Sequence, residues 1–176
     1  MNIRVLTNVS ILAVLTLAMT PVPVSAAGVT AKAALPTAQQ AATKWSADAT
    51  LVSISSLTVD KGGTAGQWTY LFYSATANKG YSVTAMKDKV VDTLAVRPHI
   101  TDPVGKDYID SPQAMQEAEN NGLKVKGTPV MSLLVMGQST KTPGVFWTVG
   151  GGYTPGEVSV IIDAKTGKFV TRQEIQ

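Results

Sequence analysis

The 176-residue sequence contains no cysteine and only one histidine, His99. Without cysteine the chain can form neither a disulfide framework nor a thiol redox centre, and a single histidine cannot build a usual zinc site. A catalytic triad with an imidazole base would have to use His99, yet Pro98 beside it predicts a surface loop, and no Gly-x-Ser-x-Gly string occurs in the chain. We therefore expect no catalytic residue and a protein that is not an enzyme.

Three aspartates, Asp102, Asp107 and Asp110, follow His99 in the same loop and could hold a hard cation through their oxygens. Their spacing does not match an EF-hand loop, and Asp110 is better explained by its place next to a helix start, where a negative charge is favourable. The glycines at 150–152 lead toward another strand rather than into a helix, so they predict a hairpin loop and not a phosphate site. We expect no metal and no cofactor.

Long apolar runs are lacking after the first 26 residues. Those residues carry Arg4, an apolar stretch at 11–19 and helix-breaking prolines at 21 and 23, which is the pattern of a secretory signal peptide cleaved after Ala26. An uncleaved anchor is the alternative. No later segment approaches the roughly 20 apolar residues that a membrane helix needs. The chain has no cysteine to which a bacterial lipid anchor could be attached, so we expect that it is not a lipoprotein. We expect an exported, soluble protein of the periplasm or extracellular space, without membrane contact after cleavage.

The net charge is only +3, from 15 basic and 12 acidic side chains. The basic residues are scattered along the chain. The group near the C-terminus, Lys165, Lys168 and Arg172, is best explained as solvated charge on an edge strand, where it discourages aggregation. We expect no nucleic-acid binding, because no basic stripe is present.

Periodicity predicts two helices and a series of strands after the export signal. Residues 27–35 are small and polar and predict a flexible lead-in, so the first helix is expected to open at Pro36. The second helix is expected to have Ser111 as its N-cap and Gly122 as its stop. Strands with a period of two are expected at 51–58, 68–73, 81–85, 90–96, 130–136, 145–149, 157–163 and 168–173.

One plan occurs twice along the chain. A proline opens each helix, at Pro36 and Pro112, and a Trp-Thr pair marks a strand of each unit, at 68–69 and 147–148. Each unit is a helix followed by antiparallel strands, which indicates an α+β fold. Whether the units share one sheet or form two packed domains is left open. The expected division is a first repeat at 36–96, a connection at 97–110 and a second repeat at 111–176.

Aromatic residues make up only 6% of the chain, so their placement is informative. Alternation puts Trp68, Tyr70 and Phe72 on one face of their strand, where large rings most often form a core, and Trp45 of the first helix is expected against Trp68 or its neighbours. The other interpretation is an exposed aromatic surface that binds a partner. On that interpretation the partner-binding residues are Trp68, Tyr70, Tyr73, Trp147 and Tyr153.

The C-terminal part carries three strings that point to a known family: SPQAMQEA at 111–118, WTV at 147–149 and EVSVIIDAKTGK at 157–168. Through them the segment at 111–174 resembles the PepSY and PepSY-like domain family of exported modules. The segment at 36–96 resembles a degenerate second copy, in which Lys87-Asp88-Lys89 takes the place of the glycine-containing final turn.

The resemblance implies a cystatin-like α+β fold of two helix-plus-antiparallel-sheet repeats, with no catalytic residues to carry over. Family members are similar to propeptide regions of secreted metallopeptidases, for which inhibition or chaperoning of a protease has been proposed. Our leading hypothesis is therefore an exported non-enzymatic module that binds a protein or peptide, with a peptidase as one candidate partner. It would bind through a sheet edge or through its aromatic face.

Two other hypotheses stay open. A pocket between helix and sheet, next to small residues such as Ala38, Ala41 and Ala42, would make the chain a small-molecule carrier. Hydrolase activity would rest on His99 and its nearby aspartates. The sheet edges also make a homodimer possible, although the charges on the last strand argue against promiscuous pairing.

Overall fold

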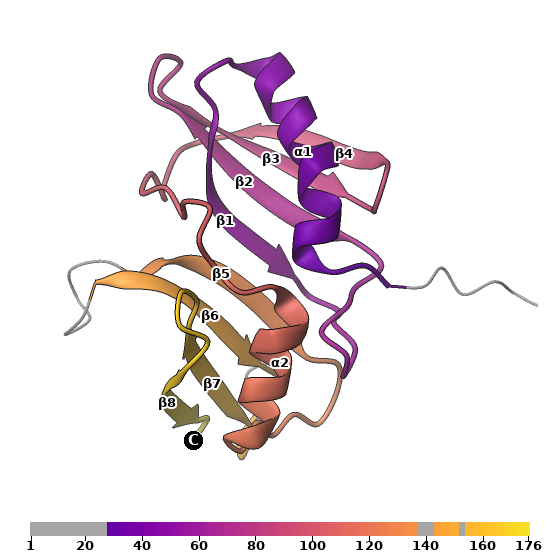
Figure 1. Cartoon of the computed structure of the whole chain (residues 1–176), viewed down its shortest axis with the longest axis vertical. Coiled ribbons are helices and arrows are strands. Elements are labelled where there is room, and N and C mark those ends of the chain that lie inside the picture. Colours follow the sequence, from indigo (N-terminus) through magenta and orange to yellow (C-terminus); the bar gives the residue numbers. More distant parts are fainter. Residues whose placement is uncertain (1–27, 137–142, 152–153) are drawn as a thin grey trace, which may run out of the picture.

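Figure 1 shows the computed structural model of the chain, which describes residues 28–136, 143–151 and 154–176. The expected signal peptide at 1–26 lies outside the described residues. Within the described ranges, no helix is long and apolar enough to cross a membrane.

All eight strands belong to one antiparallel sheet, in the order β4-β3-β2-β1-β5-β6-β7-β8. Its halves join where β1 pairs with β5, with Ile54 opposite Leu133. The α+β class is confirmed, and the sheet is continuous across the two halves. The strands are β1 (Thr50–Ser56), β2 (Trp68–Ser74), β3 (Lys79–Ala85), β4 (Val90–Val96), β5 (Val130–Met136), β6 (Gly144–Gly150), β7 (Val158–Asp163) and β8 (Phe169–Glu174).

Two helices, α1 (Ala31–Trp45) and α2 (Ser111–Asn120), lie on the same face of the sheet (Figure 1). α1 packs on β2 and β3, and α2 packs on β6 and β7. Both helices press alanine-rich faces onto the strands, and a small side chain allows the close approach of helix and sheet. A single core of buried residues runs beneath both helices. The fully buried alanines of the two helices are Ala31, Ala34, Ala38, Ala42, Ala114 and Ala118.

The first helix begins earlier than the sequence predicted. Thr30 is the N-cap and accepts a hydrogen bond from the Ala33 N–H through its side chain at 3.2 Å. Ala31 and Ala34 are fully buried, so the expected flexible lead-in at 27–35 is wrong for the part that α1 contains. An alanine-rich segment has high helix propensity but little polar-apolar contrast, which is why periodicity did not reveal it. Pro36 therefore lies inside α1 rather than at its start.

The second helix is capped by Asp110, one residue before the expected cap. Asp110 and Gln113 form a reciprocal capping box, and the Gln113 side chain accepts the Asp110 N–H at 3.0 Å. Ser111 is instead a buried helical residue whose hydroxyl accepts the Ala31 N–H at 3.0 Å. The stop at Gly122 is confirmed, because this glycine has a φ of 86° and Leu123 N–H reaches back to the Ala118 carbonyl at 3.0 Å.

The N-termini of the two helices meet at the middle of the molecule. The Asp110 carboxylate accepts the backbone N–H of Lys32 at 2.9 Å and that of Ser111 at 2.8 Å, so one side chain serves the first turns of both helices. A negative charge at a helix N-terminus is favourable because it faces the positive end of the helix dipole. This junction, together with the β1-β5 pair, joins the halves into one body.

Candidate functional site

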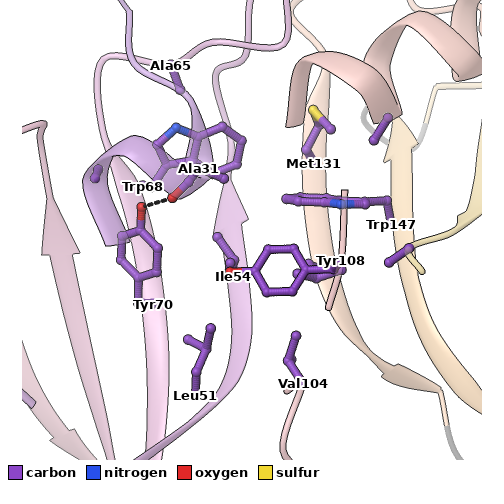
Figure 2. Packing of buried hydrophobic residues seen from close by; sticks show 14 of the residues in the cluster. Ala31, Leu51, Ile54, Ala65, Trp68, Tyr70, Val104, Tyr108, Met131 and Trp147 are labelled. Carbon is purple, nitrogen blue, oxygen red and sulfur yellow. Dashed lines mark hydrogen bonds between the residues drawn. The ribbon is translucent and has the colours of Figure 1, made fainter. Parts of the chain in front are cut away.

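The central strand aromatics form the core and not a surface. Trp68, Tyr70 and Trp147 are fully buried, and the two indole rings meet edge to face with centroids 6.2 Å apart. Figure 2 shows these rings on both sides of the junction, between the β2 half and the β6 half. Three of the five residues expected to contact a partner therefore have no exposed ring to offer.

The two buried tryptophans hold the helix starts in the same way. Trp68 Nε1 donates to the Val29 carbonyl at 2.8 Å, and Trp147 Nε1 donates to the Ile109 carbonyl at 3.0 Å. Each acceptor residue directly precedes an N-cap, Thr30 or Asp110. The Tyr70 hydroxyl adds a third bond, to the Ala31 carbonyl at 2.7 Å, drawn as the dashed line in Figure 2. Burial, with the nearby Asp110 charge as a smaller cause, raises the pKa of Tyr70, so this phenol keeps its proton and donates at neutral pH.

The other two expected contact residues are placed differently. Tyr73 is half-buried on the sheet face opposite the helices, and its hydroxyl lies 3.2 Å from the Asn78 side-chain oxygen in the β2-β3 turn. Tyr153 lies outside the described residues. Trp45 was expected against Trp68 or its neighbours on the sheet, and it stacks on Tyr81 of the adjacent strand β3, with ring centroids 4.8 Å apart.

The sheet face opposite the helices is polar at its centre. The register of the strand pairs places one serine or threonine from each of five neighbouring strands in a row across this face. All five side chains are half-buried. The Thr69 and Thr84 hydroxyls form a hydrogen bond between neighbouring strands, with their oxygens 3.1 Å apart. This face is therefore not the aromatic surface that the sequence allowed. The row consists of Thr84, Thr69, Ser55, Ser132 and Thr148.

The residues weighed for catalysis or metal binding do not form a site. His99 is exposed, and its Nδ1 lies 3.4 Å from the Arg97 carbonyl of its own loop. Asp102 and Asp107 are exposed, whereas Asp110 caps the helices. Among the described residues, no three His, Cys, Asp or Glu side chains are grouped so that they could hold a metal ion.

β4 is an exposed edge strand with apolar side chains. It pairs with β3 alone, so its outer backbone groups face no other strand of the described chain. Val91 is 48% exposed and Leu94 is 60% exposed, while Asp92 is the one charged side chain of the strand. Protein edge strands usually carry lysines, proline or a covering segment that discourage pairing with another chain. β4 has little such protection.

β8, the opposite edge, is better protected. Its first N–H, that of Phe169, donates to the Glu117 carboxylate of α2 at 3.2 Å. The strand itself carries Arg172 and Glu174. The chain beyond β8 is tied back, because Ile175 exchanges two backbone hydrogen bonds with residues 156 and 157, at 2.8 and 2.9 Å. Of the two edges, β4 is therefore the more available to a partner strand.

A groove of about 710 Å³ lies between α1, the start of β1 and the connection. Leu35 and Pro36 of α1 form one wall, and Pro103 and Tyr108 of the connection form the other, with Leu51 of β1 also lining it. The connection is fixed there by the Val104 N–H, which donates to the Leu51 carbonyl at 2.9 Å. The groove lies beside the helix, as the carrier hypothesis required, but Ala38, Ala41 and Ala42, which that hypothesis named, do not line it, and the connection contributes to it.

Two lysines and a buried phenol give this groove its polar character. Lys32 and Lys106 both line it, and the Lys32 ammonium lies 4.6 Å from the centre of the Tyr108 ring. The Tyr108 hydroxyl is buried without a hydrogen-bond partner among the described residues. Burial, with the Asp110 charge as a smaller cause, raises the pKa of Tyr108 to about 12. Figure 2 shows its ring between Ile54 and the strand that carries Trp147.

Sequence reasoning missed both the groove and its lysines. Lys32 was assigned to a flexible lead-in, and Tyr108 lies in a connection without periodicity. The available signal was the Ala31–Leu35 segment, since an alanine-rich stretch with one lysine is a good helix former. The exposed β4 edge had a clearer signal, because the strand was predicted at its observed bounds and contains a single charged residue.

No family model matches this chain, and no curated protein matches it. Among solved structures, the chain is similar to a candidate lipoprotein from Clostridium difficile 630, with 16% identity and a TM-score of 0.55 over 80% of this chain and 92% of that one. It also matches the Bacillus megaterium YpeB C-terminal domain, with 12% identity and a TM-score of 0.34 over 84% of this chain and 66% of that one.

The first of these likenesses shows a shared fold and corrects one expectation. We expected a chain that is not a lipoprotein, and this expectation is contradicted by a candidate lipoprotein that has the same fold. The expectation rested on the lack of a cysteine that could carry a bacterial lipid anchor. At 16% identity the shared fold of an open antiparallel sheet with two helices is the extent of what the comparison establishes.

Proposed function

We propose that this chain is an exported, non-enzymatic binding module of the PepSY type, built from two cystatin-like repeats, that takes up an extended segment of a protein or peptide along β4. The observation that carries the proposal is the β4 edge, with unpaired outer backbone and exposed Val91 and Leu94. An extended segment added to such an edge gains main-chain hydrogen bonds, and alternate side chains supply specificity.

Support for the two repeats comes from equivalent details in the halves. Each half has one helix followed by four strands. In each half a buried tryptophan of the second strand binds the carbonyl that precedes the helix N-cap, at 2.8 Å for Trp68 and 3.0 Å for Trp147. The same long-range hydrogen bond, from an indole N–H to the carbonyl before a helix N-cap, occurs in both halves. This repetition favours duplication of one unit. The strings at 111–118 and 157–168 favour the PepSY type for the second unit.

The partner strand would meet two kinds of side chain on β4. Leu94 lies opposite Ser82 of β3 and so belongs to the face away from the helices, whereas Thr93 lies opposite the buried Val83 and belongs to the helix face. An apolar side chain of the partner placed beside Leu94 would remove both from water, which stabilises the complex. A secreted peptidase remains a candidate partner, to be inhibited or chaperoned.

The test is retention of native exported proteins on the immobilised chain from residue 27 onward, compared between two matched edge variants. Val91→Lys/Leu94→Lys places two charges on β4, and Phe169→Lys/Val170→Lys does the same on β8, where the side chains are 39% and 47% exposed. We expect a protein, identified by mass spectrometry, whose recovery is lost with the β4 variant and kept with the β8 variant.

Circular dichroism and thermal unfolding verify that both variants are folded. Retention that is equal for the two variants, or absent for the unmodified chain, would contradict binding along β4. If the protein recovered is a peptidase, its activity in the presence of the chain distinguishes an inhibitor or chaperone from an assembly module.

A second candidate function is favoured by the groove beside α1. Its volume of about 710 Å³ falls within the range of small-molecule sites, roughly 300–1,000 Å³. In this function the chain carries a small ligand, and β4 has no part in binding it.

A further inference from the structure

The charges around the groove are all of one sign. Lys32 comes from α1 and Lys106 from the connection, and no carboxylate side chain belongs to the lining. Asp110, close in sequence to Tyr108, uses its carboxylate for the backbone N–H groups of Lys32 and Ser111, at 2.9 and 2.8 Å. In the described part of the chain neither lysine ammonium forms an ion pair. A ligand that enters the groove therefore meets two lysines and no carboxylate among the lining residues.

The rest of the lining is apolar and comes from three segments. Leu35 and Pro36 face the groove from α1, Leu51 from β1, and Pro103 from the connection. The apolar parts of a ligand would be removed from water against these side chains, at about 25 cal/mol for each Å² buried. A purely polar anion would gain nothing from them, and a purely apolar ligand would gain nothing from the lysines.

We propose that this groove binds a small amphipathic anion, a molecule with one carboxylate or phosphate head and an apolar chain. The chain lies against Leu35, Leu51 and Pro103, and the head pairs with the lysines of the lining, Lys32 from α1 and Lys106 from the connection. Lysine recognises either head as a point charge and does not by itself select between them. This inference rests on the carrier function, the second candidate above, and is independent of binding at β4.

The Lys32 ammonium is held ready for this role. Its place 4.6 Å from the centre of the Tyr108 ring fixes a side chain that would otherwise be free on the helix surface. The Tyr108 ring is itself held by burial, since only 6% of the residue is exposed. A charge positioned before binding loses less conformational entropy when the anion arrives.

Titration with three ligands of equal chain length tests the proposal. Decanoate and decyl phosphate carry the two heads, and decanol is the neutral counterpart. Binding is followed by isothermal calorimetry and by amide chemical shifts of residues 32–35 and 104–108 in the full exported chain. We expect saturable binding of at least one anion, several-fold tighter than that of decanol, and the tighter anion identifies the head group.

The lysine variants separate charge from shape. Lys32→Gln/Lys106→Gln should weaken anion binding on the order of tenfold, because each exposed charge pair contributes up to about fivefold, and should leave decanol unchanged. Lys44→Gln, in the last turn of α1 and outside the lining, is the matched control and should change nothing. Ala49→Phe should fill the groove and weaken all three ligands.

The proposal is overturned if neither anion binds, if decanol binds as tightly as the anions, or if the double lysine variant binds them like the unmodified chain. Thermal unfolding of each variant establishes that a loss of binding is not a loss of fold. No residue changed here belongs to β4, so a negative result leaves strand addition standing, and failure at β4 leaves the groove standing.

Discussion

At the scale of single residues, the most informative side chains are the two tryptophans that were first considered as partner contacts. Trp68 and Trp147 are fully buried, and each indole N–H holds the carbonyl before a helix. The sequence correctly predicted that Trp68 shares one strand face with Tyr70 and Phe72, because a period of two is enough to place alternate side chains. It could not show the hydrogen bonds, because their acceptors lie 39 and 38 residues earlier in the chain.

Replacing either indole by a phenyl ring should therefore destabilise the whole chain. Trp68→Phe and Trp147→Phe each remove a buried indole hydrogen bond and leave a smaller ring in the core, so we expect a loss of about 2 kcal/mol in the free energy of unfolding. Chemical denaturation followed by circular dichroism measures it. Trp45→Phe is the control, because this half-buried ring stacks on Tyr81 and a phenyl ring keeps most of that contact. Equal, small effects for all three variants would contradict the role of the indole bonds.

At the scale of secondary-structure elements, side-chain hydrogen bonds at helix ends position α1 on the sheet. Asp48 follows the C-terminal end of α1 and accepts the Ser74 hydroxyl at 2.6 Å, the Ser46 hydroxyl at 2.7 Å and the Thr76 N–H at 2.9 Å. These bonds join the helix end to the β2-β3 turn. They also hold the pKa of Asp48 well below its usual value, with the Ser74 hydroxyl as the largest cause.

This lowered pKa makes the bonds at Asp48 sensitive to acid. A carboxyl whose pKa is lower in the folded than in the unfolded chain adds stability when it is ionised, fully above the unfolded value of about 4 and less as pH falls toward the folded value. Asp48→Asn should therefore lower the unfolding temperature at pH 7, and its difference from the unmodified chain should shrink below pH 4. Asp102→Asn, at an exposed site in the connection, should show no such trend. A difference that stays constant with pH would contradict this account.

Element bounds show which sequence signals were sufficient. β4 and β5 were predicted at their observed bounds, because turn-forming residues precede each strand in the sequence. The start of α1 was missed, since alanine gives no contrast between faces, and the α2 cap was placed one residue late because both Asp110 and Ser111 are good capping residues. The lining of the groove could not be predicted, because its walls come from three segments that meet only in the folded chain.

At the scale of the whole molecule, the two halves share one sheet, in which β1 pairs with β5 at the centre and β4 is an edge strand. The β1-β5 pair joins residues far apart in sequence, Ile54 and Leu133, and local patterns carry no information about such a pairing. The common core and the Asp110 link between the helices predict that both halves unfold together. The unpaired edge of β4 is the surface that the proposed partner strand would use.

Hydrogen-deuterium exchange of the free chain, resolved to single strands by mass spectrometry, tests this claim most directly. The account predicts that β1 and β5 amides exchange slowest and at one common rate set by global unfolding, while outward amides of β4 exchange among the fastest of any strand. Protection of β4 equal to that of β2 would mean that the edge is covered, and fast exchange in β1 and β5 would mean that the halves are separate bodies. Either result would contradict the account.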